Sequence, residues 1–279
     1  MLAPMQTQLL LLLAIPALYV LWLSFTKSSY GAEPIFIGLD NYRRILADRA
    51  FWTSVVNTFI VVNVVVYAEI AISIAAAMLF HQVRSGKAVL MAIILAPYAI
   101  SEVVAVLAWK FLVEPDVGLL HAFFMALGVE IQWATNPVHA LLLAAVIGIW
   151  VHFPFSFLLI YAARISIPDE LYEAARVDGA NPWQTFRRVT LPLLMPAILI
   201  AIIFRYIFGF RIFSEIWLLT QGGPARSTEV LAVYLYKNAF RFNEFGMAAA
   251  TGWLMVIGSL LLASFYMFRV YRTGFRQEG

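Results

Sequence analysis

The sequence predicts an all-α membrane protein with six transmembrane helices. Of its 279 residues, 63% are hydrophobic and 13% are charged, whereas a typical soluble domain has about 45–50% apolar and about 25% charged residues. This composition excludes a soluble enzyme, a nucleic-acid-binding protein and a disordered scaffold, and a net charge of +3 is too small to indicate a polyanionic partner. The chain has no cysteine, which excludes a disulfide framework, a thiolate metal site and a cysteine nucleophile.

Six apolar segments approach or exceed the ~20 residues that a helix needs to cross the hydrocarbon core. The first resembles the core of a signal peptide, but it is longer than the roughly 7–15 residues usual there. It also lacks a basic head and a clean small-residue cleavage site, so we expect a retained helix. One transmembrane domain is expected over residues 1–279, with helices near 8–25, 54–80, 88–113, 138–163, 193–219 and 247–270.

The distribution of lysine and arginine predicts the orientation. An even number of spans places both termini on one side, and cytoplasmic segments carry more of these residues. One set of segments has nine of them within about 45 residues, and the opposite set has eight over nearly twice that length. The denser set, predicted to be cytoplasmic together with both termini, comprises Arg84, Lys87, Arg164, Arg176, Arg187, Arg188, Arg269, Arg272 and Arg276.

Two connecting segments have clear local signals. In the outer segment 27–53, the letters GLDNY at 38–42 predict a turn, followed by an amphipathic helix through Trp52. The cytoplasmic linker 81–87 is short, so the helices before and after it should form an antiparallel hairpin. No internal repeat is visible, which weakens the interpretation of the chain as an inverted-repeat secondary transporter.

The long cytoplasmic segment 166–192 is predicted to begin with a helix. Ser166 can cap this helix and Pro168 fits its first turn. Gly179 would end it, because glycine adopts the left-handed conformation at little cost. Its small residues leave room for another surface to approach. Two interpretations remain open, an interfacial linker with well-capped helices and a docking element for a cytoplasmic partner.

A second short helix is predicted to follow the glycine. Asn181 would cap it, Pro182 would occupy its first position, and Gln184 can complete a capping-box-like pair. Pro192 would then open the next membrane span. The segment as a whole therefore reads as a helix, a glycine corner and a second helix outside the bilayer.

Two motifs carry a resemblance to a known family. The first is Glu173-Ala174-Ala175, three residues, Gly179, and then Val189-Thr190-Leu191-Pro192. It resembles the EAA loop of ATP-binding-cassette importer permeases, with valine in place of isoleucine at 189. Asp178-Gly179-Ala180 resembles the form seen in carbohydrate-type permeases. The second motif, Leu219-Thr220-Gln221-Gly222-Gly223-Pro224, resembles the outer loop of maltose, trehalose and glycerol-phosphate importer permeases.

The resemblance implies a permease subunit of an ATP-driven importer in the inner membrane. Its cargo would be a sugar or sugar derivative delivered by an external solute-binding protein. Its partners would be a second permease and two ATP-binding subunits, which would hold ATP and Mg. The residues from Glu173 to Ala180 would couple to an ATP-binding subunit. This chain lacks the GxxxxGK[ST] phosphate loop, so we expect no enzymatic activity, cofactor or metal site in it.

Several ionisable residues lie inside predicted spans, where each costs about 2.5–3.5 kcal/mol to insert. They are Glu69, Glu102, His152, Arg205, Arg211 and Glu215. Structural pairing is the first interpretation for each; the ring of His152, for example, could bind the carbonyl that Pro154 frees. The spacing predicts an Arg211–Glu215 pair on one helix face. Arg205 needs a carboxylate from another helix, Glu69 or Glu102, or else faces a wet cavity, where it could bind an anionic sugar.

A stripe of aromatic residues is predicted on the fifth helix. Tyr206, Phe210, Phe213 and Trp217 recur at helical spacing. They either pack against neighbouring helices or stack on sugar rings, and the resemblance implies that this helix lines the translocation path. Two other functions remain open, an ion-coupled secondary transporter and an intramembrane enzyme. The first lacks an ordered relay of ionisable groups, and the second lacks a paired catalytic motif.

Overall fold

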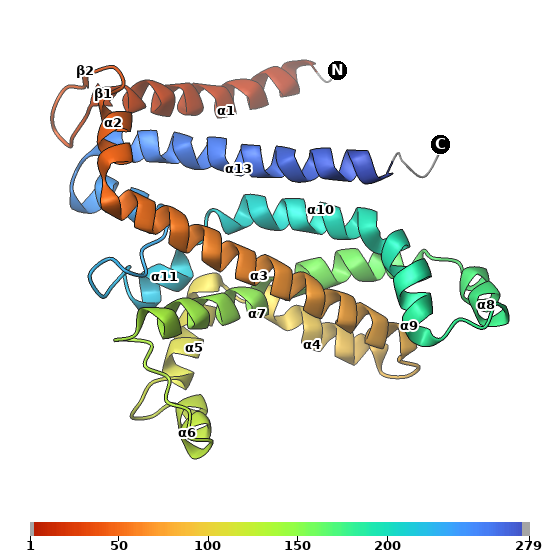
Figure 1. Ribbon diagram of the computed structural model, residues 1–279. Helices are drawn as coiled ribbons and strands as arrows, with labels where there is room; N and C mark the ends of the chain where they lie inside the picture. The colour runs from red at the N-terminus through yellow and green to blue at the C-terminus, as the bar shows by residue number, and fades with distance from the viewer. Residues whose placement is uncertain (1–2, 275–279) are drawn as a thin grey trace.

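The protein is a bundle of long helices. The computed structural model describes residues 3–274, in which five helices are long and apolar enough to cross a membrane (Figure 1). The long elements are α1 (Ala3–Ser24), α3 (Arg49–Gln82), α7 (Pro137–Ile165), α10 (Leu191–Gly209) and α13 (Phe245–Gly274). The shorter elements are β1 (Thr26–Lys27), β2 (Ile35–Phe36), α2 (Asp40–Ala47), α4 (Lys87–Ala99), α5 (Glu102–Leu112), α6 (Leu119–Ala126), α8 (Asp169–Val177), α9 (Pro182–Thr185), η1 (Phe186–Thr190), α11 (Ser214–Leu219), α12 (Leu231–Tyr236) and η2 (Lys237–Arg241).

The main core lies between α3, α7 and α10. Val66, Phe157 and Leu194, which are at most 1% exposed, belong to one apolar cluster there. The outer faces of these helices expose apolar side chains such as Val56, Leu142 and Leu193, as expected where lipid is the solvent. Helix α1 packs on α13 and otherwise exposes leucines such as Leu12, 68% exposed. The apolar runs in the sequence therefore mark both the core and the lipid-facing surface.

The predicted span 88–113 is not one straight helix. Helices α4 and α5 meet at a bend of 98° around residues 100–101, so the pair is either a broken span or a re-entrant loop. Pro97 lies near the end of α4 and cannot donate a hydrogen bond to the carbonyl four residues earlier. Ile100 then adopts an extended conformation. The bend places Glu102 at the first position of α5.

The predicted fifth span 193–219 is wrong at both ends. The helix begins at Pro182 and ends at Gly209, so α9, η1 and α10 form one continuous helix of 28 residues. Pro192 interrupts nothing, because the preceding turn widens into the π-helical segment η1, where Leu191 donates to the carbonyl of Phe186. At the other end Gly209 packs so closely on Val62 that a Cβ atom would lie 2.9 Å from it. The chain turns there before α11.

The first outer segment also differs from its prediction. Gly38 has φ of +60°, as the predicted turn requires. The helix after it, α2, ends at Ala47, and Asp48 caps α3 by accepting a hydrogen bond from the Ala50 amide at 2.9 Å. Trp52 therefore lies in α3 and not in the amphipathic helix. The antiparallel pairing of β1 with β2 was not predicted.

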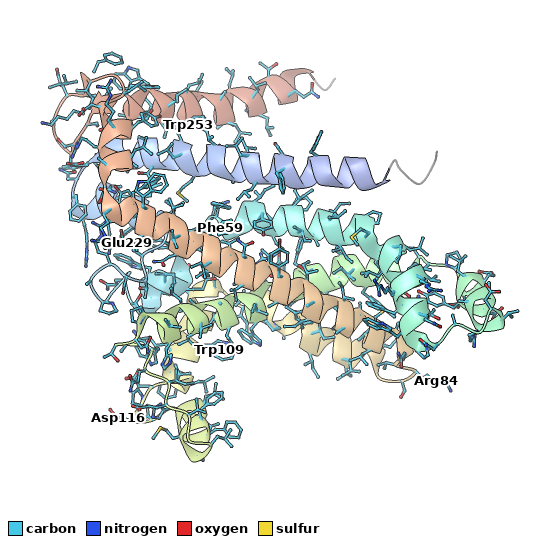
Figure 2. All side chains as sticks on the ribbon, in the orientation of Figure 1. Phe59, Arg84, Trp109, Asp116, Glu229 and Trp253 are labelled. Atoms are coloured by element: carbon cyan, nitrogen blue, oxygen red, sulfur yellow. The ribbon has the colours of Figure 1, made fainter. Side chains whose placement is uncertain are left out.

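The two ends of the bundle carry different segments. The start of α1, the end of α13, the α3–α4 connection and α8 lie at one end, and α2, α6 and α11 lie toward the other (Figure 1). Figure 2 places Arg84 at the first end and Asp116 and Glu229 at the second. This agrees with termini on the same side as segment 166–192; the side that faces the cytoplasm remains a prediction. Arg276 and Gly279 lie outside the described residues, as do the side chains of Arg269 and Arg272.

Candidate functional site

Helix α8 ends in the predicted glycine corner. Gly179 has φ of +74°. Its amide donates to the Arg176 carbonyl at 3.1 Å, and the Ala180 amide donates to the Ala175 carbonyl at 2.9 Å. These two bonds form a Schellman motif, which satisfies carbonyls that the end of a helix leaves free. Asp178 occupies the C-cap position between the helix and the glycine. The corner therefore has a fixed geometry.

The second helix of the segment begins as predicted and the first does not. Asn181 and Gln184 form a capping box, each side chain accepting from the other residue's amide at 2.9 Å, and Pro182 holds the first position. Ser166 does not cap α8. It ends α7, and its hydroxyl donates to the Ala162 carbonyl. Pro168 is the N-cap residue of α8 and lies outside its first turn.

We name α8, Gly179, Ala180 and α9 the corner element. Tyr172 anchors it, because its hydroxyl lies 3.1 Å from the hydroxyl of Thr190 and its ring lies 4.4 Å from the guanidinium of Arg164. Glu173 is 69% exposed, and among the residues that the structure describes its one ion pair is with Arg176, at 3.9 Å. Ala174 is exposed and Ala175 is buried. At the other end of the motif, Leu191 and Pro192 lie within the continuous helix.

The corner element also exposes apolar side chains. Val177 is 88% exposed and Trp183 is 67% exposed. The corner projects from one end of the bundle (Figure 1). A rigid, exposed and partly apolar element of this kind has the properties of a docking surface.

A second candidate region is a cavity of about 330 Å³ inside the bundle. Residues of α3, α4, α5, α7, α10 and α11 line it, together with the turn after α10. Its polar lining residues are Tyr98, Glu102, His152, Arg205, Arg211 and Glu215. Polar groups at this depth are rare in membrane proteins and mark functional sites or internal pairs.

Arg205 pairs with a carboxylate from another helix, as predicted. Its Nε atom lies 2.7 Å from the Glu69 Oε2 atom, and the two side chains are 5% and 0% exposed. Ser156 donates to the other oxygen of Glu69. The charge of Arg205 is therefore neutralised within the protein, which favours a structural role.

The other acidic groups of the cavity are arranged differently. Glu102 accepts a hydrogen bond from Ser214 at 3.0 Å, and its Oε1 atom lies 3.5 Å from His152 Nε2. Glu215 lies 4.0 Å from the same His152 nitrogen. One Glu215 oxygen, Oε2, is buried without a hydrogen-bond partner among the residues described. His152 thus faces two carboxylates rather than the carbonyl that Pro154 frees.

Two predictions for the fifth helix are wrong because the helix ends at Gly209. Arg211 lies in the turn and Glu215 in α11, and the ion pairs of the described chain do not include one between them. The aromatic residues do not share one helical face. Phe213 stacks on Trp217 at 5.7 Å, and both contact Tyr236.

The remaining two aromatic residues also lie apart from the cavity lining. Tyr206 is 1% exposed and donates a hydrogen bond to Asn63 at 2.6 Å. Phe210 packs against two apolar clusters. The aromatic residues that line the cavity are Tyr98, Phe155 and Phe208.

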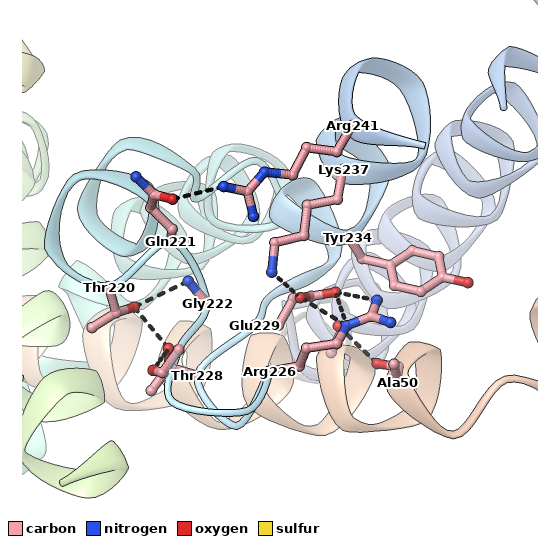
Figure 3. A network of polar contacts seen from close by, with 12 residues as sticks. Ala50, Thr220, Gln221, Gly222, Arg226, Thr228, Glu229, Tyr234, Lys237 and Arg241 are labelled. Atoms are coloured by element: carbon pink, nitrogen blue, oxygen red, sulfur yellow. Dashed lines mark hydrogen bonds and ion pairs between the residues drawn. The ribbon is translucent and has the colours of Figure 1, made fainter. Parts of the chain in front are cut away.

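The outer motif folds around a buried carboxylate, as Figure 3 shows. Glu229 is 0% exposed and pairs with Arg226 at 2.7 Å and with Lys237 at 2.5 Å. Gly222 lies against this pair; a Cβ atom there would be 3.0 Å from the Lys237 nitrogen. Gln221 accepts from Arg241 at 3.1 Å. The peptide bond from Gly223 to Pro224 is cis.

Further contacts fasten this loop to α3. Asn57 donates to the carbonyls of Ser227 and Glu229. The hydroxyl of Tyr234 donates to Asp48 at 2.8 Å. Burial and this hydrogen bond raise the pKa of Tyr234, and the hydrogen bonds from Arg226 to Glu229 raise the pKa of Arg226. Arg226 and Lys237 lie only three and eight residues from Glu229 in the sequence, but neither spacing indicates that the carboxylate is buried. The sequence motif therefore located the loop but not its buried charges.

Residues 69–275 match the family of binding-protein-dependent transport system inner membrane components. The chain belongs to this family. As an inner membrane component, it is an ABC transporter permease with several membrane-spanning helices, which agrees with the resemblance that the two motifs carry. Family membership favours the binding-protein-dependent transporter over the ion-coupled transporter and the intramembrane enzyme.

Similar proteins support the same family. The trehalose/maltose transport system permease protein MalF of Thermococcus litoralis is 31% identical over 283 residues, which cover 100% of this chain and 94% of the relative. The trehalose transport system permease protein SugA of Mycobacterium tuberculosis is 31% identical over 271 residues, which cover 96% and 86%.

The fold also has a solved counterpart. A chain in the crystal structure of a bacterial ABC transporter involved in the import of the acidic polysaccharide alginate matches with a TM-score of 0.85 and 24% identity. The match covers 98% of this chain and 94% of that chain. At this level of identity, the likeness shows the shared fold.

Proposed function

We propose that this chain is a permease subunit of an ATP-driven importer and forms part of the path for a sugar or sugar derivative. Relatives named for trehalose and maltose transport, each 31% identical over nearly the whole chain, support this cargo. The partners would be a second permease, two ATP-binding subunits that hold ATP and Mg, and an external solute-binding protein. A solved relative of the same fold was crystallised with a periplasmic protein bound to an alginate pentasaccharide.

The corner element is the observation that carries the proposal. A Schellman motif and a capping box fix its backbone, while Glu173, Val177 and Trp183 remain exposed at one end of the bundle. A carboxylate flanked by apolar groups on a rigid support suits a cleft with a basic residue in a partner protein. The continuous helix from Pro182 to Gly209 joins this element to the cavity. Movement of a bound partner can thus reach the cavity through one helix.

The test is a charge reversal at the exposed carboxylate. Glu173→Lys should abolish sugar uptake and weaken co-purification with the ATP-binding subunit, while membrane insertion and thermal stability stay unchanged. Asp116→Lys, an exposed charge reversal at the opposite end of the bundle, is the matched control and should leave co-purification intact. Parental uptake in Glu173→Lys would overturn the proposed coupling role.

The proposed orientation places both termini and the corner element in the cytoplasm. A topology reporter fused after Gly279 should be active only on the cytoplasmic side, and a reporter inserted near Gly223 only outside. The reverse pattern would contradict the orientation.

The cavity favours a neutral sugar over an anionic derivative. Glu69 already neutralises Arg205, so among the cationic side chains of the described cavity lining only Arg211 is left to meet an anionic group. Tyr98 and Phe155 offer rings against which a sugar could stack. Tyr98→Ala should therefore weaken neutral sugar uptake more than Phe213→Ala, whose ring stacks on Trp217 instead. Selective loss of an anionic solute in Arg211→Gln would reassign the cargo.

A further inference from the structure

Three side chains that can ligate a metal converge at the cavity wall. Glu102 comes from α5, His152 from α7 and Glu215 from α11, and one ligand atom of each lies within 4.8 Å of the others. His152 Nε2 is 3.5 Å from the Glu102 Oε1 atom and 4.0 Å from the Glu215 Oε1 atom. We propose that these three residues form a binding site for a divalent transition-metal ion of the zinc class.

The distances between the ligand atoms fit such an ion if the ligands move slightly closer together. Zinc bonds to histidine nitrogen and carboxylate oxygen are about 2.0–2.2 Å long, which separates the ligand atoms of a tetrahedral site by about 3.3–3.6 Å. The His152–Glu102 distance of 3.5 Å already fits. The Glu215 Oε1 atom, 4.0 Å from His152 Nε2, needs to approach that nitrogen by about 0.5 Å. A mixed nitrogen and oxygen set suits zinc better than Ca²⁺ or Mg²⁺, which prefer oxygen alone.

The unpaired oxygen of Glu215 is an independent observation that points to a cation. The Glu215 side chain is 2% exposed, and its Oε2 atom has no hydrogen-bond partner among the described residues. A buried carboxylate without a partner is costly, because it has lost water and gained nothing in return. A cation bound by this carboxylate would supply the missing interaction.

A neighbouring hydroxyl orients one of the ligands. Ser214 donates to the Oε2 atom of Glu102 at 3.0 Å, which leaves the Oε1 atom facing His152. Hydrogen bonds of this kind fix the direction of metal-bound carboxylates and tune affinity. Ser214 therefore acts as a positioning residue for the site.

The charges around the cavity also admit a cation. Arg205 is one of two guanidinium groups in the cavity lining, and it is paired with Glu69. Glu69, Glu102 and Glu215 oppose two guanidinium groups, those of Arg205 and Arg211, so one negative charge is in excess when His152 is neutral. The site opens into the cavity of about 330 Å³, which leaves a fourth position for water.

The site lies beside both breaks in the bundle. Glu102 begins α5 directly after the 98° bend, and Glu215 lies in α11 just beyond the turn that ends α10. Both meet at His152 of the continuous helix α7. A bound ion would therefore tie the two broken segments to one helix of the core.

The test is zinc binding to the purified full-length protein, with an affinity tag that contains no histidine. Equilibrium dialysis against buffered ZnCl₂, followed by elemental analysis, should give one tightly bound zinc per chain. X-ray absorption should show only nitrogen and oxygen ligands. Glu215→Gln, Glu102→Gln and His152→Gln should each weaken binding by more than about 100-fold, and Ser214→Ala by about 10-fold. None of these measurements requires transport.

Matched variants elsewhere in the chain control for adventitious binding. His121→Gln and Glu130→Gln remove the same donor types from the outer segment around α6 and should leave the zinc stoichiometry unchanged. The elution volume in size-exclusion chromatography checks that every variant is folded. If Glu215→Gln does not fold, Glu102→Gln carries the test, because its side chain is 43% exposed. Absence of tight zinc binding, or binding that persists in Glu102→Gln, would overturn the proposal.

Discussion

Glu229 in the outer loop and Glu215 in the cavity are equally buried, at 0% and 1% exposure, yet their surroundings differ. Arg226 and Lys237 both pair with Glu229. Glu215 has a histidine nitrogen at 4.0 Å and one oxygen without a hydrogen bond in the described part of the chain. A buried carboxylate is stable when the fold supplies its partners. Glu229 therefore has all the partners that a buried carboxylate needs, whereas Glu215 can still accept a partner from a ligand.

The largest effect on stability is expected at Glu229, the buried carboxylate with two cationic partners. Glu229→Gln leaves the buried Lys237, 8% exposed, without a counter-charge and also removes the partner of Arg226, which is 36% exposed. The loss of the buried pair should lower the free energy of unfolding by about 3–5 kcal/mol. Thermal unfolding in detergent, followed by circular dichroism, measures the loss. Glu244→Gln is the control: its pair with Arg44 is 38–45% exposed, so it should cost less than about 1 kcal/mol. Equal losses would show that burial does not distinguish the two pairs.

A somewhat smaller effect is expected at the paired charges beside the cavity. Arg205→Gln and Glu69→Gln should each cost about 3 kcal/mol, because each leaves one buried charge unpaired while the hydrogen bond of Ser156 partly compensates Glu69. The double variant should lose less than the sum of the two. The yield of folded protein and its melting temperature give the three values. Additive losses would mean that the two residues act independently.

The parts of the structure that could be predicted are those with local signals. Gly179, Asn181 and Gln184 each specify a backbone conformation within a few residues, and the structure confirms all three. The two breaks could not be predicted, because a run of apolar residues reads the same whether the helix is straight or bent. At the second break, Gly209 packs closely on Val62, a residue far away in the sequence, so this contact leaves no local signal.

The same reasoning separates the candidate sites. The corner element is encoded by one contiguous motif, so Glu173, Gly179 and Asn181 could be identified from the sequence, whereas the exposure of Val177 and Trp183 could not. The cavity takes one or two residues from each of several helices. Glu102 and His152 stood out as ionisable residues at membrane depth, but their convergence with Glu215 depends on both breaks. The Glu229 network combines ion pairs to nearby residues with the long-range hydrogen bonds of Asn57, and no local pattern indicates the burial that results.

A third, smaller effect concerns alkaline stability. Tyr234→Phe removes the hydrogen bond to Asp48 and should cost about 1 kcal/mol at neutral pH. The raised pKa of Tyr234 means that the folded state holds the phenol proton more tightly than the unfolded chain does. This contribution is full below the unfolded value of about 10 and is lost as the pH rises above it. The free energy of unfolding, measured from pH 8 to pH 11, should therefore fall less steeply with pH in Tyr234→Phe than in the parent.

The smallest effect on stability is expected at Glu215, the buried carboxylate with one oxygen that has no hydrogen bond among the described residues. Glu215→Gln, measured with a chelator present, should change the free energy of unfolding by less than about 1 kcal/mol or should stabilise the protein, because it removes a buried carboxylate whose Oε2 atom has no hydrogen-bond partner among the described residues. Melting in detergent beside Glu229→Gln makes the comparison direct. A loss as large as that of Glu229→Gln would mean that the cavity, like the outer loop, is already complete.

Because the helix from Pro182 to Gly209 is continuous, a tilt of this helix at one end displaces its other end. Its 28 residues span about 42 Å at 1.5 Å per residue. If one end is held, a tilt of about 5° moves the other end by about 4 Å, the width of one atomic contact. Gly209 packs too closely on Val62 to move by that distance without a change in their contact. A tilt that the helix transmits from the corner element would therefore require repacking at the turn after Gly209, beside the cavity.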